Sequence, residues 1–160
     1  MPPLPASLQE LVCGEWHPSQ ARLPPLPSSL RRLFISQGPC TSMWGECTCG
    51  SAREEGQCGN CTCLEHLPPL AGSSIQILEC VHCPELRQLP SLPSTLRRLT
   101  CINCFELREL PQLPPSLREL ECINCTQLQE LPPLPASLTR LETFRGWGHH
   151  RHRHSGRESR

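Results

Sequence analysis

Residues 89–141 read LPSLPSTLRRLTCINCFELRELPQLPPSLRELECINCTQLQELPPLPASLTRL, and apolar side chains recur in this stretch at a constant step of 21 residues. Leucines recur at this step in two series: Leu96, Leu117 and Leu138, and Leu99, Leu120 and Leu141. Cysteines recur at the same step in two pairs: Cys101 with Cys122, and Cys104 with Cys125. A fixed period of this length predicts a solenoid, because one unit is too short to bury a core and must stack on its neighbours.

Around Leu96 the unit runs L-x-x-L-x-C-x-x-C-x-x-L-x-x-L-P. This pattern resembles the leucine-rich repeat, with Cys101 in the third apolar place and Cys104 in the Asn/Cys place. The LPxLPxxLxxL segments most resemble the short, proline-rich repeats of bacterial effectors of the YopM and IpaH kind. Leucine-rich regions of plant immune receptors are a second resemblance. The resemblance implies a scaffold that binds another protein, such as an effector or a recognition protein.

Leu99 and Cys101 alternate with Arg98, Thr100 and Ile102, which is the periodicity of a strand. Stacked units would place these strands in a parallel sheet, and the Leu-Pro-x-Leu-Pro segments would return in an extended conformation. The expected fold is therefore a mainly β, curved leucine-rich-repeat stack with parallel strands on the concave face, extended proline-rich backs and little helix.

Weaker units extend the pattern toward Leu4, so we assign residues 1–144 to the repeats. Residues at about 36–57 are Cys-rich and irregular, and form either a degenerate repeat or an insertion. The degenerate repeat is favoured because Leu33 and Leu78 are 45 residues apart, close to two periods. Cys58 and Cys61 align with Cys80 and Cys83 in the next unit. Residues 145–160 are expected to be a disordered His/Arg-rich tail.

The alternation of residues along each strand also predicts which side chains lie on the concave face of the sheet, where a partner would bind. Three columns emerge, of which one carries Arg and Glu, one is largely acidic and one is apolar. The candidate partner-binding residues on the concave face are Val81, Arg98, Thr100, Ile102, Glu119, Glu121, Ile123, Arg140 and Phe144. An exposed apolar column beside charges predicts a protein-binding surface, although loops or self-association could cover it instead.

The composition excludes several function classes. The 15 basic residues, all arginine, balance 15 acidic ones, which argues against a nucleic-acid or membrane partner. No catalytic constellation is evident, so we expect no enzyme activity. No secretory or membrane-spanning segment is evident either, which predicts a cytoplasmic protein or one secreted without a cleavable signal peptide.

The thirteen cysteines permit a second function. Repeat cysteines such as Cys101 are expected to be small buried thiols, because the period places them inside the stack. The irregular cluster between Cys40 and Cys63 lacks that explanation. Zinc held by its Cys47, Cys49, Cys58 and Cys61 would make the chain a small structural-zinc protein, whereas disulfides or free thiols are the alternatives. Otherwise we expect no cofactor.

Neither end of the repeat stretch carries an evident polar cap, before Leu4 or after Leu141. Solenoids need polar ends, since the terminal units otherwise expose their apolar edges. Three explanations remain open: end-to-end self-association, marginal stability, or a fragment of a larger leucine-rich-repeat receptor or ubiquitin-ligase effector.

Overall fold

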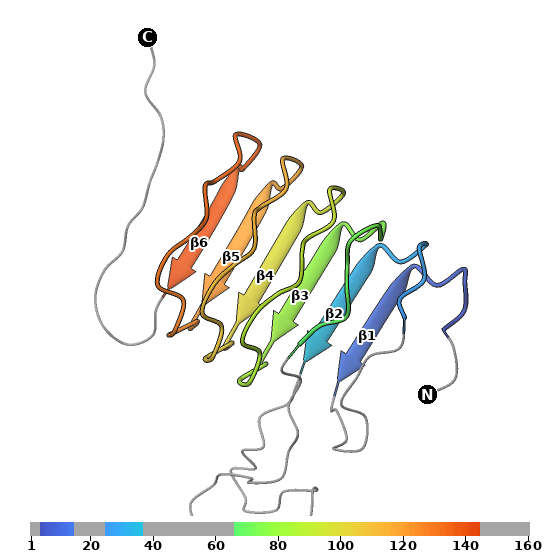
Figure 1. The fold of residues 1–160 in the computed structure, drawn as a ribbon, viewed down its shortest axis with the longest axis horizontal. Coiled ribbons are helices and arrows are strands. Elements are labelled where there is room, and N and C mark those ends of the chain that lie inside the picture. The colour runs from blue at the N-terminus through green and yellow to red at the C-terminus, as the bar shows by residue number, and fades with distance from the viewer. Residues whose placement is uncertain (1–3, 15–24, 37–65, 145–160) are drawn as a thin grey trace, which may run out of the picture.

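The computed structural model describes residues 4–14, 25–36 and 66–144. Six short strands form one sheet in the order β1-β2-β3-β4-β5-β6, and every neighbouring pair is parallel (Figure 1). The strands are β1 (Glu10–Gly14), β2 (Arg32–Ser36), β3 (Ile77–Val81), β4 (Arg98–Ile102), β5 (Glu119–Ile123) and β6 (Arg140–Phe144). The prediction of a mainly β, parallel solenoid is confirmed for the described residues, which contain no helix.

The strand register follows the sequence period. Residues that share a place in the repeat lie beside one another on successive strands, so inward side chains form two continuous columns. The first column is Leu11, Leu33, Leu78, Leu99, Leu120 and Leu141, and the second is Cys13, Ile35, Cys80, Cys101, Cys122 and Thr143. These columns build the core, because alternate residues of a strand point to the same face.

A turn precedes each strand, and before every strand except β3, where it begins at Leu70, the turn begins at a proline. The Leu96 amide donates to the Pro93 carbonyl at 3.1 Å, and the Leu117 amide donates to the Pro114 carbonyl at the same distance. The Ser or Thr before the leucine ties the turn to the preceding rung. The Ser116 hydroxyl donates to the Leu96 carbonyl at 2.6 Å, and Ser137 and Thr95 make equivalent bonds. These hydroxyls therefore satisfy backbone carbonyls that the turns leave unpaired.

A second turn follows each of β3, β4 and β5 and contains a residue in the left-handed conformation. His82, Asn103 and Asn124 have φ values of 53°, 56° and 55°. Their side chains form a ladder, in which Asn124 Nδ2 donates to Asn103 Oδ1 at 2.8 Å and Asn103 Nδ2 donates to His82 Nδ1 at 2.9 Å. This ladder of side chains was not predicted from the sequence.

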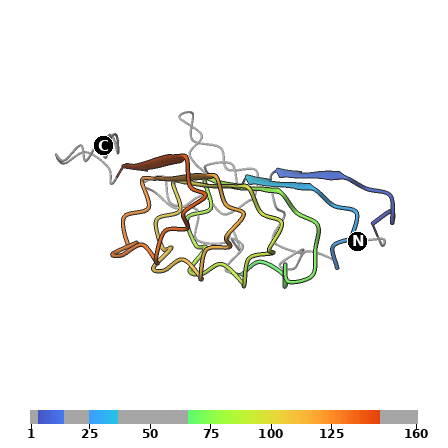
Figure 2. The same ribbon diagram turned by 90° about the horizontal axis from the view of Figure 1, so that it is seen from above.

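The core lies between the sheet and the proline-rich returns. Figure 2 shows the sheet along one side of the molecule and the returns along the other. Leucines from both sides meet there, and Leu78, Leu86, Leu99, Leu107 and Leu120 are fully buried. No helix in the described ranges is long and apolar enough to cross a membrane.

The structure corrects the expected position of Cys58. β2 pairs directly with β3, and Ile35 of β2 is the neighbour of Cys80. A repeat containing Cys58 was expected at that place, so the four-pair cysteine ladder is wrong at its first step. Leu33 and Leu78 are 45 residues apart, which is one 21-residue period plus 24 residues, so sequence distance alone could not distinguish a long connection from an extra rung. Cys58 itself, with the rest of the irregular stretch from residue 37 and the tail from residue 145, lies outside the described residues.

Candidate protein-interaction face

The outer face of the sheet presents three columns of side chains that run across the strands. The first column is Glu10, Arg32, Ile77, Arg98, Glu119 and Arg140, the second is Val12, Phe34, Glu79, Thr100, Glu121 and Glu142, and the third is Ser36, Val81, Ile102, Ile123 and Phe144. The predicted partner-binding residues all belong to these columns. The register thus brings together side chains that are far apart in the sequence.

Ion pairs across the strands hold the charged side chains of this face in place. Arg32 lies 3.1 Å from Glu10 and 3.0 Å from Glu79, measured between guanidinium nitrogen and carboxylate oxygen. Arg98 Nη2 lies 2.6 Å from Glu119 Oε2, as an ion pair without an aligned hydrogen bond. Pairs this exposed add little to stability, so their main effect here is to order the face.

Arg140 on β6 is the centre of the largest group of charges. Its guanidinium nitrogens lie 2.9 Å from a carboxylate oxygen of Glu142 and 3.1 Å from one of Glu121, and a third contact of 4.0 Å reaches Glu119. The hydrogen bonds that Arg140 donates to Glu142, followed by the negative charges around it, raise the pKa of Arg140. Arg140 therefore stays positively charged among these carboxylates.

The third column is apolar from β3 to β6. Val81, Ile102 and Ile123 are half-buried, whereas Phe144 at the end of the column is 51% exposed. The column thus forms a continuous apolar ridge along one edge of the ion-pair network. Apolar surface bordered by charged side chains, arginine among them, is the composition of many protein-binding faces.

Thr100 differs from the other predicted residues of the face. It is only 5% exposed, and its hydroxyl donates to Glu121 Oε2 at 3.3 Å. Thr100 was predicted to contact a partner, and its burial leaves it no surface for one. The short side chain lies between the longer glutamates of the neighbouring strands, so its direct role is to orient Glu121.

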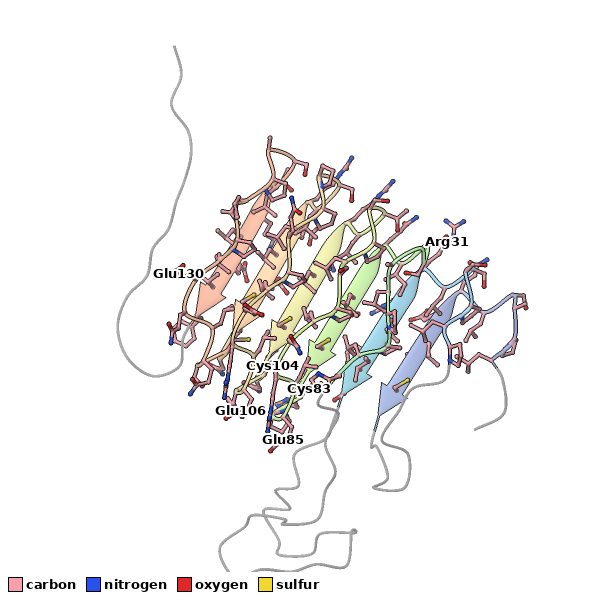
Figure 3. All side chains as sticks on the ribbon, in the orientation of Figure 1. Arg31, Cys83, Glu85, Cys104, Glu106 and Glu130 are labelled. Carbon is pink, nitrogen blue, oxygen red and sulfur yellow. The ribbon has the colours of Figure 1, made fainter. Side chains whose placement is uncertain are left out.

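Under the sheet, six cysteine side chains are stacked in three consecutive rungs: Cys80, Cys83, Cys101, Cys104, Cys122 and Cys125. All six are buried, as the repeat period predicts. Cys83 and Cys104 occupy corresponding places on neighbouring rungs (Figure 3). Each thiol of the second position reaches a carbonyl of the preceding rung, as in the 3.5 Å contact from Cys104 Sγ to the Cys80 carbonyl. Cys104 therefore contacts a backbone carbonyl as well as filling the core.

Among these thiols the pKa values are shifted in both directions, and a hydrogen bond with Cys104 lowers the pKa of Cys125. Hydrogen bonds with Cys104, Cys122 and Cys80, together with burial, raise the pKa of the Cys101 thiol well above its ordinary value. A neutral, buried thiol is a poor nucleophile and a poor metal ligand. Within the described ranges, no cluster of Cys, His, Asp or Glu side chains could hold a metal ion. The zinc candidates Cys47, Cys49, Cys58 and Cys61 lie outside those ranges.

A scan against protein-family models, a search of curated proteins and a search of solved structures each found no match to this chain. The functional argument therefore rests on the fold and on the chemistry of its outer face. The fold is a parallel-strand solenoid of the kind that leucine-rich-repeat-like stacks form.

Proposed function

We propose that this chain is a non-enzymatic interaction scaffold that binds another protein through the outer face of its sheet. The observation that carries the proposal is the apolar ridge of Val81, Ile102, Ile123 and Phe144 beside an ordered network of Arg–Glu pairs. Repeat solenoids have extended faces that suit the binding of large partners.

The order of the face favours binding. The stacked rungs fix the backbone of the face. The ion pairs already restrict the long arginine and glutamate side chains, which would otherwise lose conformational freedom when a partner binds. A surface that is ordered before binding loses less conformational entropy when a partner arrives. The balance of charges fits a partner that is itself mixed in charge, with apolar side chains that cover the ridge.

A finer proposal follows from the sequence motif. The unit LPxLPxxLxxL resembles the repeats of bacterial leucine-rich effectors, so we place this scaffold in that functional class. The motif supports this proposal, as does the agreement of the rung with the motif's period. A leucine-rich fold by itself does not identify a partner.

The test compares partner binding by the sheet face with partner binding by the opposite side. The affinity of the full chain for a protein that it captures is compared with the affinities of two variants for the same protein. One is the double variant Ile102→Arg/Ile123→Arg, and the other is Arg108→Glu, a control at an exposed position of the return. We expect the double variant to weaken binding by about a hundredfold, as for central interface residues, and the control to bind as the unchanged chain does. Equal binding by the double variant would place the interface elsewhere and overturn the proposal.

A further inference from the structure

The last rung of the stack presents an apolar end. Leu141 is 38% exposed, whereas Leu33, Leu78, Leu99 and Leu120 in the same column are fully buried. Leu134 on the return of the same rung is 47% exposed. A cavity of about 70 Å³ lies beside this rung, lined by Cys122, Cys125, Leu128, Leu131 and Thr143. Within the described residues, no strand covers this end of the sheet.

The outer edge of β6 also has backbone groups available for pairing. The Arg140 amide donates to the Arg118 carbonyl at 3.0 Å, and the Phe144 carbonyl accepts from the Asn124 amide at 2.6 Å. These groups point toward β5. Because backbone groups of successive residues in a parallel strand point to alternate sides, those of Leu141 and Thr143 point outward. Such an edge is a template for another strand.

The first rung has the matching arrangement at the opposite end of the stack. The Gln9 carbonyl accepts from the Arg32 amide at 3.0 Å, so the backbone groups of Glu10 and Val12 point away from β2. Leu8, Leu11 and Cys13 are only partly buried against the core. β1 and β6 lie at opposite ends of the row of strands in Figure 1 and in Figure 2.

We propose that these two ends bind each other, with β6 of one copy of the chain pairing in parallel with β1 of the next copy. Continuing the observed register places Leu11 against Leu141, Cys13 against Thr143 and Glu10 against Arg140. The last pair repeats the contact that Glu10 already makes with Arg32 at 3.1 Å. The junction would therefore reproduce the packing and charge pairing of an ordinary rung.

Ser7 supplies a second match. The residues Pro-Ala-Ser-Leu occur at 5–8 and again at 135–138. Ser137 donates to the carbonyl of Leu117 in the preceding rung, and Ser29 donates likewise to Leu8. Ser7 is the equivalent residue of the first rung, and it is exposed. In the proposed junction its hydroxyl would donate to the Leu138 carbonyl of the neighbouring copy.

The two surfaces in this contact differ, so the contact is heterologous and does not close on itself as a twofold dimer does. Assembly should therefore continue beyond two copies as concentration rises. The proposal concerns the ends of the stack and is independent of the partner that the sheet face binds. It would extend that face over several copies.

Two proline substitutions at the outward-facing amides test the junction. Val12→Pro removes an amide from the outer edge of β1, and Thr143→Pro removes one from the outer edge of β6. Proline is tolerated at an edge strand where its missing N–H faces solvent. The controls Val12→Thr and Thr143→Val keep the amide and the β-branched shape. Sedimentation is measured under reducing conditions, so that disulfides do not link copies.

The unchanged chain and both controls are expected to exceed twice the monomer mass with increasing concentration. Each proline variant alone should stay monomeric, and an equimolar mixture of the two should form a one-to-one dimer, since each retains the end that the other lacks. Leu141→Arg, whose charge can remain in solvent, should act as Thr143→Pro does. Circular dichroism checks that each variant is folded.

Three results would overturn the proposal. The unchanged chain could remain monomeric at all concentrations, either proline variant could still dimerise alone, or the mixture could fail to associate although both variants are folded. Assembly that begins only after removal of residues 145–160 would show that this segment covers the end instead. None of these results bears on the sheet face, which the capture experiment tests separately.

Discussion

Asn103 illustrates how single residues join one rung to the next. It adopts a φ of 56°, and its side chain bonds to His82 on one side and to Asn124 on the other. Asparagine tolerates the left-handed conformation better than most residues other than glycine. The same residue therefore forms the turn and links three rungs.

Substitution of Asn103 separates these two effects. Asn103→Gly removes the side-chain hydrogen bonds but tolerates the positive φ, and we expect the free energy of unfolding to fall by about 1–2 kcal/mol. Asn103→Ala loses the same bonds and also strains the turn, so it should lose about 1 kcal/mol more. Urea unfolding of the two variants measures the difference. If alanine proves no worse than glycine, backbone strain at this turn is not important.

For single residues, the sequence predicted the buried positions more accurately than the exposed ones. The inward positions of Cys101 and Cys104 followed from their period, because a buried site tolerates only small apolar or well-paired groups. Thr100 was predicted to be exposed because strand alternation alone does not show that neighbouring glutamates cover a short side chain. The Asn ladder could have been found from the recurrence of Ile-Asn-Cys at 102–104 and 123–125.

At the scale of the element, a rung is defined by its turns as much as by its strand. The Pro-x-x-Leu turn sets the direction of entry into the strand, and the Ser or Thr within it bonds to the rung before. The recurrence of these hydroxyl residues is evident in the sequence, which does not show where they bond. Their bonds across rungs became evident from the structure.

Ser116→Ala tests this link between rungs. The Ser116 hydroxyl lies 2.6 Å from the carbonyls of both Ser94 and Leu96. Removing it should lower the free energy of unfolding by about 1 kcal/mol, because the hydroxyl has one proton to donate and the part-buried Leu96 carbonyl loses that donor. Ser91→Ala, at an exposed site on the return, is the matched control and should change stability by less than about 0.5 kcal/mol. Equal urea midpoints for the two variants would exclude a structural role for the Ser116 bonds.

The boundaries of the strands could be predicted where the 21-residue period was intact. The prediction was wrong where the period was interrupted. The strands from β3 to β6 follow the 21-residue step, so their register was predicted correctly. The direct pairing of β2 with β3 was not predicted. Sequence distance alone cannot distinguish an insertion within a rung from an added rung of similar length.

For the molecule as a whole, the described strands contact only their immediate neighbours, and each neighbouring pair is joined by the same register. Stability in such a stack is approximately the sum of the rungs and of the interfaces between them. The inner rungs bury their leucines on both sides, while the last rung exposes Leu134 and Leu141. The absence of an evident polar cap in the sequence predicted an exposed end after Leu141, and within the described residues no strand covers β6. The partner of the sheet face could not be predicted, because binding specificity depends on a second surface that this chain does not encode.

The central claim is that interchangeable rungs of 21 residues build the molecule, and deletion of one complete period tests it most directly. Removing residues 99–119 joins Arg98 to Leu120 and restores the repeat pattern. Removing residues 99–108, less than half a period, is the control that destroys the pattern. Urea unfolding followed by circular dichroism compares the two. We predict that the full-period deletion unfolds cooperatively with a smaller m value, because less surface is buried, and that the control loses its cooperative transition. Similar unfolding of the two deletions would contradict the account.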